Sequence, residues 1–71
     1  MEKFSVQLRG RNYSIDPQHN GTYRVFDGDK KIGVIYPEAE AEHIAWKTMD
    51  DLEQDFVSHI GELISAYGRN L

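Results

Sequence analysis

Histidine and carboxylate side chains are the groups in this sequence best suited to acid–base or metal chemistry. His59 follows Asp55 by four residues, a spacing that would place the two side chains on neighbouring turns of a helix. The pair has the elements of a catalytic dyad, but an exposed pair at this spacing ordinarily contributes only about 0.3–0.5 kcal/mol and does no chemistry. His19 stands alone in a stretch with the composition of a turn. We therefore predict no catalytic role for His19 or His59.

His43 is the histidine closest to a candidate metal site, because Glu40 and Glu42 precede it. No second histidine follows at the four-residue spacing typical of zinc-binding helices, and the chain contains no cysteine. The glycines have the spacing of hairpin turns rather than that of a phosphate-binding loop, and no nucleophile motif is present. The sequence thus predicts a protein that is not an enzyme and that has no metal site and no cofactor.

The segment 50–67 is the longest periodic stretch and predicts an amphipathic α-helix. Its apolar side chains cover about half of the helical circumference, which is too broad for a two-stranded coiled coil and suits packing on a sheet. Asp50 is the expected N-cap, because Glu53, three residues later, would be placed to bond back to it. The apolar residues of this helix are Leu52, Phe56, Val57, Ile60, Leu63, Ile64, Ala66 and Tyr67.

Alternation of apolar and polar residues up to residue 16 predicts two antiparallel strands that meet at a tight turn. A turn at residues 9–10 sets Phe4 opposite Ile15. The same turn sets Val6 opposite Tyr13. A turn one residue later would keep these side chains on the same face, because the register would move by two residues.

The composition of residues 16–21 is that of a turn, and a third strand is expected over 22–26. A loop of odd length before this strand would put Tyr23 and Val25 on the core face. A two-residue turn would put Phe26 there instead. We expect the odd-length loop, because it buries two apolar side chains rather than one.

The fourth strand, 31–36, is apolar on both faces, as expected for a central or covered strand. With the preceding turn centred on residues 28–29, Ile32 and Val34 join the core face. Gly33, inside this strand, indicates a β-bulge or a close approach of another part of the backbone.

The acidic stretch 38–42 is expected to be a connection, either a helical turn or a mobile loop, before a short fifth strand over 43–47. These elements predict one α+β domain over residues 1–71, an antiparallel meander of four or five strands with one C-terminal helix, about 50–67, packed across one face. The expected core consists of Phe4, Val6, Leu8, Tyr13, Ile15, Tyr23, Val25, Ile32, Val34, Ile44, Trp46, Leu52, Phe56, Val57, Ile60, Leu63 and Ile64.

The net charge of −4 is divided unevenly along the chain. Residues 1–36 carry six basic and four acidic side chains, a balance of +2, whereas residues 37–71 carry two basic and eight acidic ones, a balance of −6. This distribution disfavours nucleic-acid binding by the domain as a whole. No apolar run is long enough to span a membrane, and the first residues lack the apolar core of a signal peptide, so we expect a cytoplasmic protein with no membrane association.

The sheet face without the helix is the expected binding surface. Apolar side chains remain there after the core face is filled, and a core this small gains from further burial against a partner. We therefore predict a non-catalytic protein-interaction module that binds a partner protein, or a second copy of itself, through this face. On the expected registers its residues are Arg24, Phe26, Gly33 and Ile35.

Binding of single-stranded nucleic acid is the alternative function. Aromatic residues on the predicted sheet would offer stacking surfaces for bases, and nearby cations would contact the phosphates. The cations concerned are Arg9, Arg11, Arg24, Lys30 and Lys31. A common face shared with an exposed aromatic ring would favour this alternative, whereas cations scattered around the rim of the sheet would disfavour it.

Overall fold

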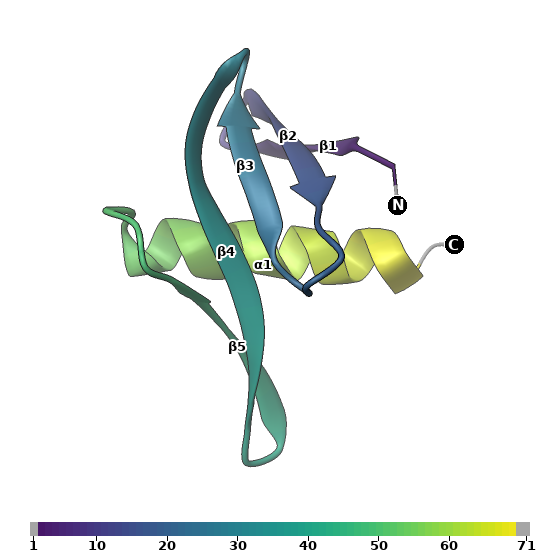
Figure 1. Ribbon diagram of the computed structural model, residues 1–71, viewed down its shortest axis with the longest axis vertical. Coiled ribbons are helices and arrows are strands. Elements are labelled where there is room, and N and C mark those ends of the chain that lie inside the picture. Colours follow the sequence, from purple (N-terminus) through teal and green to yellow (C-terminus); the bar gives the residue numbers. More distant parts are fainter. Residues whose placement is uncertain (1, 70–71) are drawn as a thin grey trace.

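Five antiparallel strands and one helix make up residues 2–69, the part of the chain that the computed structural model describes (Figure 1). The strands pair in chain order, and α1 lies across one face of the sheet. The predicted α+β meander with a C-terminal helix is confirmed. The elements are β1 (Phe4–Leu8), β2 (Arg11–Pro17), β3 (Tyr23–Asp27), β4 (Lys30–Glu40), β5 (His43–Thr48) and α1 (Gln54–Arg69).

The turn between β1 and β2 contains two residues with positive φ, Arg9 at 55° and Gly10 at 77°. A two-residue turn of this kind has a twist that matches the right-handed twist of the strands it joins. Of the two registers that the sequence left open, the structure has the one with the turn at residues 9–10, with Phe4 opposite Ile15. Between β2 and β3 the loop is five residues long, 18–22, and the prediction of an odd-length loop is also confirmed.

A β-bulge interrupts the pairing of β3 with β4. Phe26 lies opposite Lys31, but Val25 lies opposite Gly33, so Ile32 is an extra residue on β4. An extra residue in one strand moves every later side chain of that strand to the other face. The bulge therefore decides which half of β4 faces the helix.

The predicted faces of Val34 and Ile35 are wrong because of this bulge. Ile35 is fully buried in the core, at 0% exposure, and Val34 is half-buried on the opposite face of the sheet. Gly33, also expected on the opposite face, is buried on the helix side, where a Cβ would lie 2.7 Å from Cδ1 of Leu52. The prediction of a bulge beside Gly33 is confirmed, whereas the atoms that come close to Gly33 belong to the side chains of Leu52 and Asp50 and not to another part of the backbone.

Two side chains, that of Thr48 at the end of β5 and that of Asp50 just after it, form hydrogen bonds with the backbone of β4. Asp50 Oδ2 accepts a hydrogen bond from the Val34 backbone N–H at 2.8 Å, and Thr48 Oγ1 donates to the Val34 carbonyl oxygen at 2.7 Å. Asp50 is thus engaged with the sheet, and the predicted N-cap role is wrong. α1 begins at Gln54, and the Glu53 carbonyl oxygen accepts its first intrahelical bond from Val57.

Replacing Asp50 with alanine should lower the free energy of unfolding by about 1–2 kcal/mol, because the Val34 N–H loses a charged acceptor. Urea denaturation followed by circular dichroism measures the change. Asp51→Ala is the matched control, because Asp51 is an exposed neighbour of the same charge, and its effect should stay within about 0.5 kcal/mol. Equal losses in the two variants would show that general charge near α1, rather than the bond to Val34, stabilises this corner.

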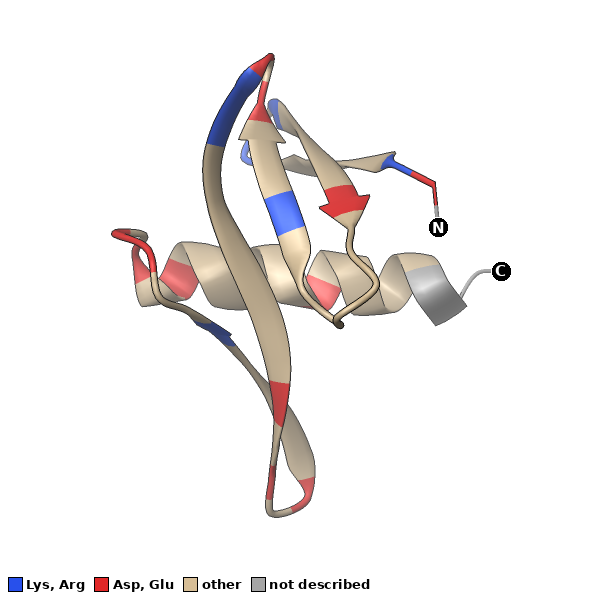
Figure 2. Ribbon diagram, in the orientation of Figure 1, with Lys and Arg blue, Asp and Glu red and all other residues tan. Residues whose placement is uncertain are grey.

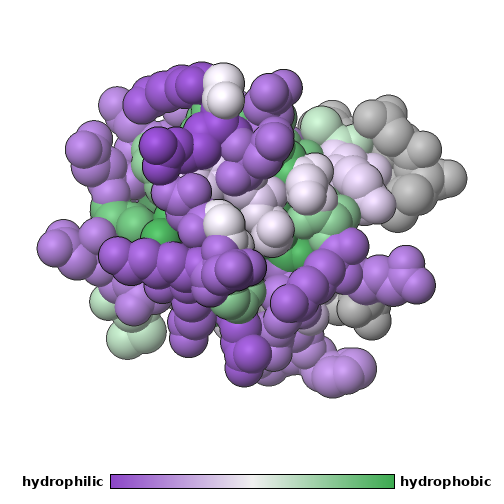
Figure 3. Space-filling model, turned by 90° about the horizontal axis from the view of Figure 1, so that it is seen from above, coloured by the Kyte–Doolittle hydropathy of each residue, from purple (hydrophilic) through white to green (hydrophobic). Residues whose placement is uncertain are grey.

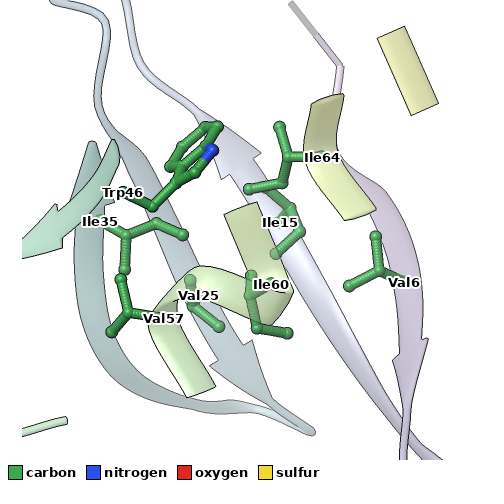
Figure 4. Close-up of a cluster of buried hydrophobic side chains, with 8 residues drawn as sticks. All are labelled: Val6, Ile15, Val25, Ile35, Trp46, Val57, Ile60 and Ile64. Atoms are coloured by element: carbon green, nitrogen blue, oxygen red, sulfur yellow. The ribbon is translucent and has the colours of Figure 1, made fainter. Parts of the chain in front are cut away.

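The core lies between α1 and the sheet (Figure 4). Most predicted core residues are buried there or pack against the buried cluster, but Val34 and Ile44 do not belong to it, and Ile44 is 54% exposed. Tyr13 meets Phe56 edge to face, with ring centroids 5.2 Å apart, as aromatic pairs prefer. The buried residues are Val6, Ile15, Val25, Ile35, Trp46, Val57, Ile60 and Ile64.

Trp46 packs directly against the backbone of α1 at Gly61. A Cβ placed on Gly61 would overlap the five-membered ring of the indole, at Cγ, Cδ1 and Cδ2. Only glycine leaves room for the ring at this height of the helix. The glycine that weakens α1 in isolation therefore permits its closest contact with β5.

β4 and β5 continue beyond the rest of the sheet as a two-stranded arm. The last residue of β4 that pairs with β3 is Ile35, so residues 36–40 pair only with β5. We call residues 36–47 the β4–β5 arm; Figure 1 shows it extending past α1. The prediction of a connection over 38–42 is wrong for residues 38–40, which are strand, and only Ala41 and Glu42 form the turn.

Candidate interaction surfaces

The sheet face opposite α1, the outer face, carries a group of cations around one aromatic ring. Lys3 Nζ lies 5.1 Å from the centre of the Phe26 ring, within the range of a cation–π contact. Arg24 projects from the same face two residues before Phe26, and Lys31 lies opposite Phe26 on β4. We call Lys3, Arg24, Phe26 and Lys31 the basic patch. None of the ion pairs within residues 2–69 involves its three cations.

Two of the four residues predicted for an interaction surface lie on the outer face, namely Arg24 and Phe26. Gly33 and Ile35 are buried on the helix side, so their assignment to this surface is wrong. The bulge puts Val34 and Tyr36 on the outer face in their place, and both are half-buried. Because strand 31–36 is apolar throughout, its alternation alone could not distinguish the two arrangements.

The five cations considered for nucleic-acid binding do not share one face. Arg24 and Lys31 belong to the basic patch, whereas the other three lie at or beside the β1–β2 and β3–β4 turns. Figure 2 shows Lys and Arg at that end of the sheet and on β3, with Asp and Glu at the far end of the β4–β5 arm. Seen from above, where the β3–β4 turn lies, the surface is mainly hydrophilic (Figure 3).

The cations at the turns have carboxylates near them. Arg11 Nη1 lies 2.7 Å from Asp27 Oδ2 in an exposed ion pair. Arg9 lines a shallow hollow of about 350 Å³ whose walls also include Asp51 and Glu53. Negative charge beside these arginines opposes the approach of phosphate groups. The basic patch is therefore the part of the basic half that is free to meet an anion.

The histidines do not assemble a catalytic or metal-binding cluster in the part of the chain described. His43 Nε2 lies 3.7 Å from Glu40 Oε1, near the tip of the β4–β5 arm. Lys47 Nζ lies 3.0 Å from the other oxygen of Glu40, and its hydrogen bond and charge lower the pKa of the Glu40 carboxyl. Over residues 2–69, no three His, Asp or Glu side chains are grouped as metal ligands would be.

A groove that was not predicted from the sequence lies between β5 and α1. Its volume is about 360 Å³. At one end, Gln54 Nε2 donates to the Trp46 carbonyl oxygen at 2.9 Å and to Ser58 Oγ at 3.0 Å. We call it the edge groove, because β5 is the last strand of the sheet. It is lined by His43, Ile44, Ala45, Trp46, Gln54, Ser58, Glu62 and Ser65.

No protein-family model matches this chain, and the searches of curated proteins and of solved structures also find no match. Within residues 2–69, no helix combines the length and the hydropathy needed to cross a membrane.

Proposed function

We propose that this chain is a non-catalytic protein-interaction module whose basic patch binds an acidic segment of a partner protein. The observation that carries the proposal is the set of three cations, without ionic partners in residues 2–69, around a half-buried aromatic ring. They lie on the sheet face that α1 leaves uncovered. An unpaired cation keeps its full attraction for a carboxylate from another molecule, and the ring supplies apolar contact at the centre.

A second copy of the chain is one candidate source of the acidic segment. The β4–β5 arm carries Glu38, Glu40 and Glu42, and it extends away from the basic patch. Of these, Glu40 is already engaged by Lys47 within its own chain. Self-association through these two surfaces would join unlike patches, either reciprocally in a two-fold dimer or head to tail in a ring or an open chain.

Binding of single-stranded nucleic acid remains the alternative, and one observation favours it: Arg24, Lys31 and Lys3 do share a face with Phe26. The patch is small, however, and a base-stacking surface normally presents successive rings along the path of the strand. The β4–β5 arm, which extends away from the patch, carries carboxylates that would repel a phosphate backbone extending in that direction. These charges favour a protein partner.

Charge reversal at Lys31 should strongly weaken the binding of an acidic probe. A fluorescein-labelled peptide of alternating Glu and Val, titrated by fluorescence anisotropy, should lose affinity by at least about tenfold with Lys31→Glu. Lys30→Glu is the matched control, because Lys30 lies opposite Asp27 and points to the other face of β4. It should change the affinity by less than about twofold. Higher salt should weaken binding to the unaltered chain.

Two results would contradict the proposal. The first is a preference for nucleic acid, in which a mixed-sequence single-stranded oligonucleotide binds at least about tenfold more tightly than the peptide. The second is the absence of peptide binding together with a sedimentation profile that is monomeric at all concentrations. Loss of binding in both Lys30→Glu and Lys31→Glu would show that total charge, not the outer face, governs the interaction.

A further inference from the structure

We propose that the edge groove binds an extended, positively charged peptide segment of a partner protein, which adds to β5 as a sixth strand. This site is separate from the basic patch, lies on the helix side of the sheet, and prefers the opposite charge. Four features carry the inference: the free backbone groups of Ile44 at the edge of β5, the composition of the groove walls, the absence of proline and of a bulge from β5, and the local charge.

The backbone groups of Ile44 and Trp46 point away from β4. Pro37 lies opposite Trp46 and has no N–H, so this pair cannot be one that exchanges two hydrogen bonds across the strands. In an antiparallel pair such residues direct their N–H and carbonyl groups to the outside. Gln54 confirms the direction, because its Nε2 reaches the Trp46 carbonyl from outside the sheet. Ile44 stands two residues earlier and has the same orientation.

The two walls of the groove differ in character. On the strand side, Ile44 is 54% exposed and stands beside Trp46, which is almost fully buried. On the helix side, Ser58, Glu62 and Ser65 form a polar stripe along α1. Helix and strand meet at Gln54, which also lines the groove. A strand added to β5 would have its side chains between these walls.

Edge strands normally carry a device that prevents pairing with other chains, such as a proline, a bulge or an inward-pointing charge. β5 has no proline, and its pairing with β4 shows no register shift. At the opposite edge, Phe4 of β1 is covered by Tyr67 of α1, with the two rings stacked at 4.0 Å. The β5 edge therefore offers free backbone groups at Ile44, beside an exposed apolar side chain, whereas the Trp46 carbonyl oxygen is already bonded to Gln54.

The charge around the groove selects the occupant. Glu62 lines the groove itself, and Glu42 stands at the turn next to His43. Lys47, the cation of β5, is neutralised by Glu40. A basic segment would therefore be attracted, whereas β5 of a second copy would bring two sets of carboxylates into one interface. This argument favours a foreign basic strand over a symmetric dimer through β5.

A fluorescein-labelled peptide of alternating Lys and Val is the probe, titrated against the whole chain by fluorescence anisotropy. Glu62→Lys should weaken its binding by at least about tenfold, because the variant places a cation in the groove. Asp55→Lys is the matched control, since Asp55 is an exposed carboxylate of α1 outside the groove, and it should change the affinity by less than about twofold. Lys31→Glu should leave this binding intact, which separates the site from the basic patch.

Amide hydrogen exchange tests the added strand directly. The Ile44 amide should exchange at least about tenfold more slowly when the Lys–Val peptide is bound, because its N–H gains an acceptor. Ile44→Pro removes that N–H from the free edge without removing a bond to β4, and should abolish peptide binding while leaving the melting temperature nearly unchanged.

Equal binding to Glu62→Lys and to the unaltered chain would overturn the proposal. So would tighter binding of the alternating Glu–Val peptide at this groove, or concentration-dependent dimerisation that protects Ile44 without any peptide.

Discussion

Truncating Ile60 to alanine will lower the free energy of unfolding by about 2–5 kcal/mol. Ile60 has 0% exposure and projects from the middle of α1 into the buried cluster, near Val25 and Ile15 (Figure 4). The substitution removes three side-chain carbons and leaves a cavity. Because α1 packs along the sheet, it cannot easily shift to fill that cavity. A chain of this length has a total stability of roughly 4–11 kcal/mol, so the loss is a large share of it. Urea denaturation followed by circular dichroism measures the change.

Ser65→Ala is the control for Ile60→Ala, because Ser65 is exposed on the same helix. Its effect should stay within about 0.5 kcal/mol. Ser58, which a helical projection places almost opposite Ile60, is a poorer control, since it is half-buried and accepts a hydrogen bond from Gln54. A larger loss for Ser65→Ala than for Ile60→Ala would mean that α1 presents its other face to the sheet.

Gly61→Ala will also destabilise the chain, although helix propensity by itself predicts a gain of about 1 kcal/mol. The new methyl group would overlap the indole of Trp46, which is 7% exposed and packed on the helix backbone. Displacing a buried ring costs about 1–3 kcal/mol or more, so overpacking outweighs the propensity gain and the net effect is a loss. Trp46 is the only tryptophan, and its fluorescence should shift to longer wavelength as the ring becomes exposed.

The sign of the Gly61 effect can be reversed by removing the ring. In a Trp46→Ala background, Gly61→Ala should stabilise the chain by about 1 kcal/mol, as the intrinsic preference of helices for alanine requires. The double-mutant cycle therefore isolates the contact between helix and ring. A stabilising Gly61→Ala in the presence of Trp46 would show that the ring is not seated on the helix backbone.

Local signals in the sequence were sufficient for the first three strands. The core faces of β1 and β2 are the same for either possible turn, so alternation was enough to predict them, and the structure has the turn at Arg9 and Gly10. An odd-length loop between β2 and β3 was expected because it buries two apolar side chains of β3 rather than one, and Val25 is buried as expected. In both cases the deciding residues lie within the hairpin itself.

The errors arose where the deciding contact is distant in sequence. Gly33 indicated a bulge, but not that Ile32 would be the extra residue, and the side chains of Leu52 and Asp50 that pack against Gly33 come from beyond β5. Asp50 has the residue type and position of an N-cap, and a bond to the Val34 N–H in another strand takes precedence. Local capping rules cannot detect a competitor sixteen residues away.

The candidate surfaces were predictable to a similar degree. The outer-face assignment is correct for Arg24 and Phe26, because the faces of β3 were predicted correctly. It is wrong for Gly33 and Ile35, because the bulge turns both to the helix side. The edge groove could not be anticipated, since it depends on how α1 crosses β5 and on which helix side chains face that strand. Ser58, Glu62 and Ser65 look like ordinary solvent-facing positions in a helical projection.

The meander order of the sheet has a consequence for synthesis on the ribosome. Each strand pairs with its neighbour in sequence, so the strands can assemble one after another as they emerge, with little loop-closure entropy to overcome. Their common cover, α1, is translated only after β5. Until it docks, the nascent sheet exposes Ile15, Val25 and Ile35 to other chains, and a chaperone would have its binding site there. Variants that weaken the packing of α1 on the sheet should therefore prolong this interval.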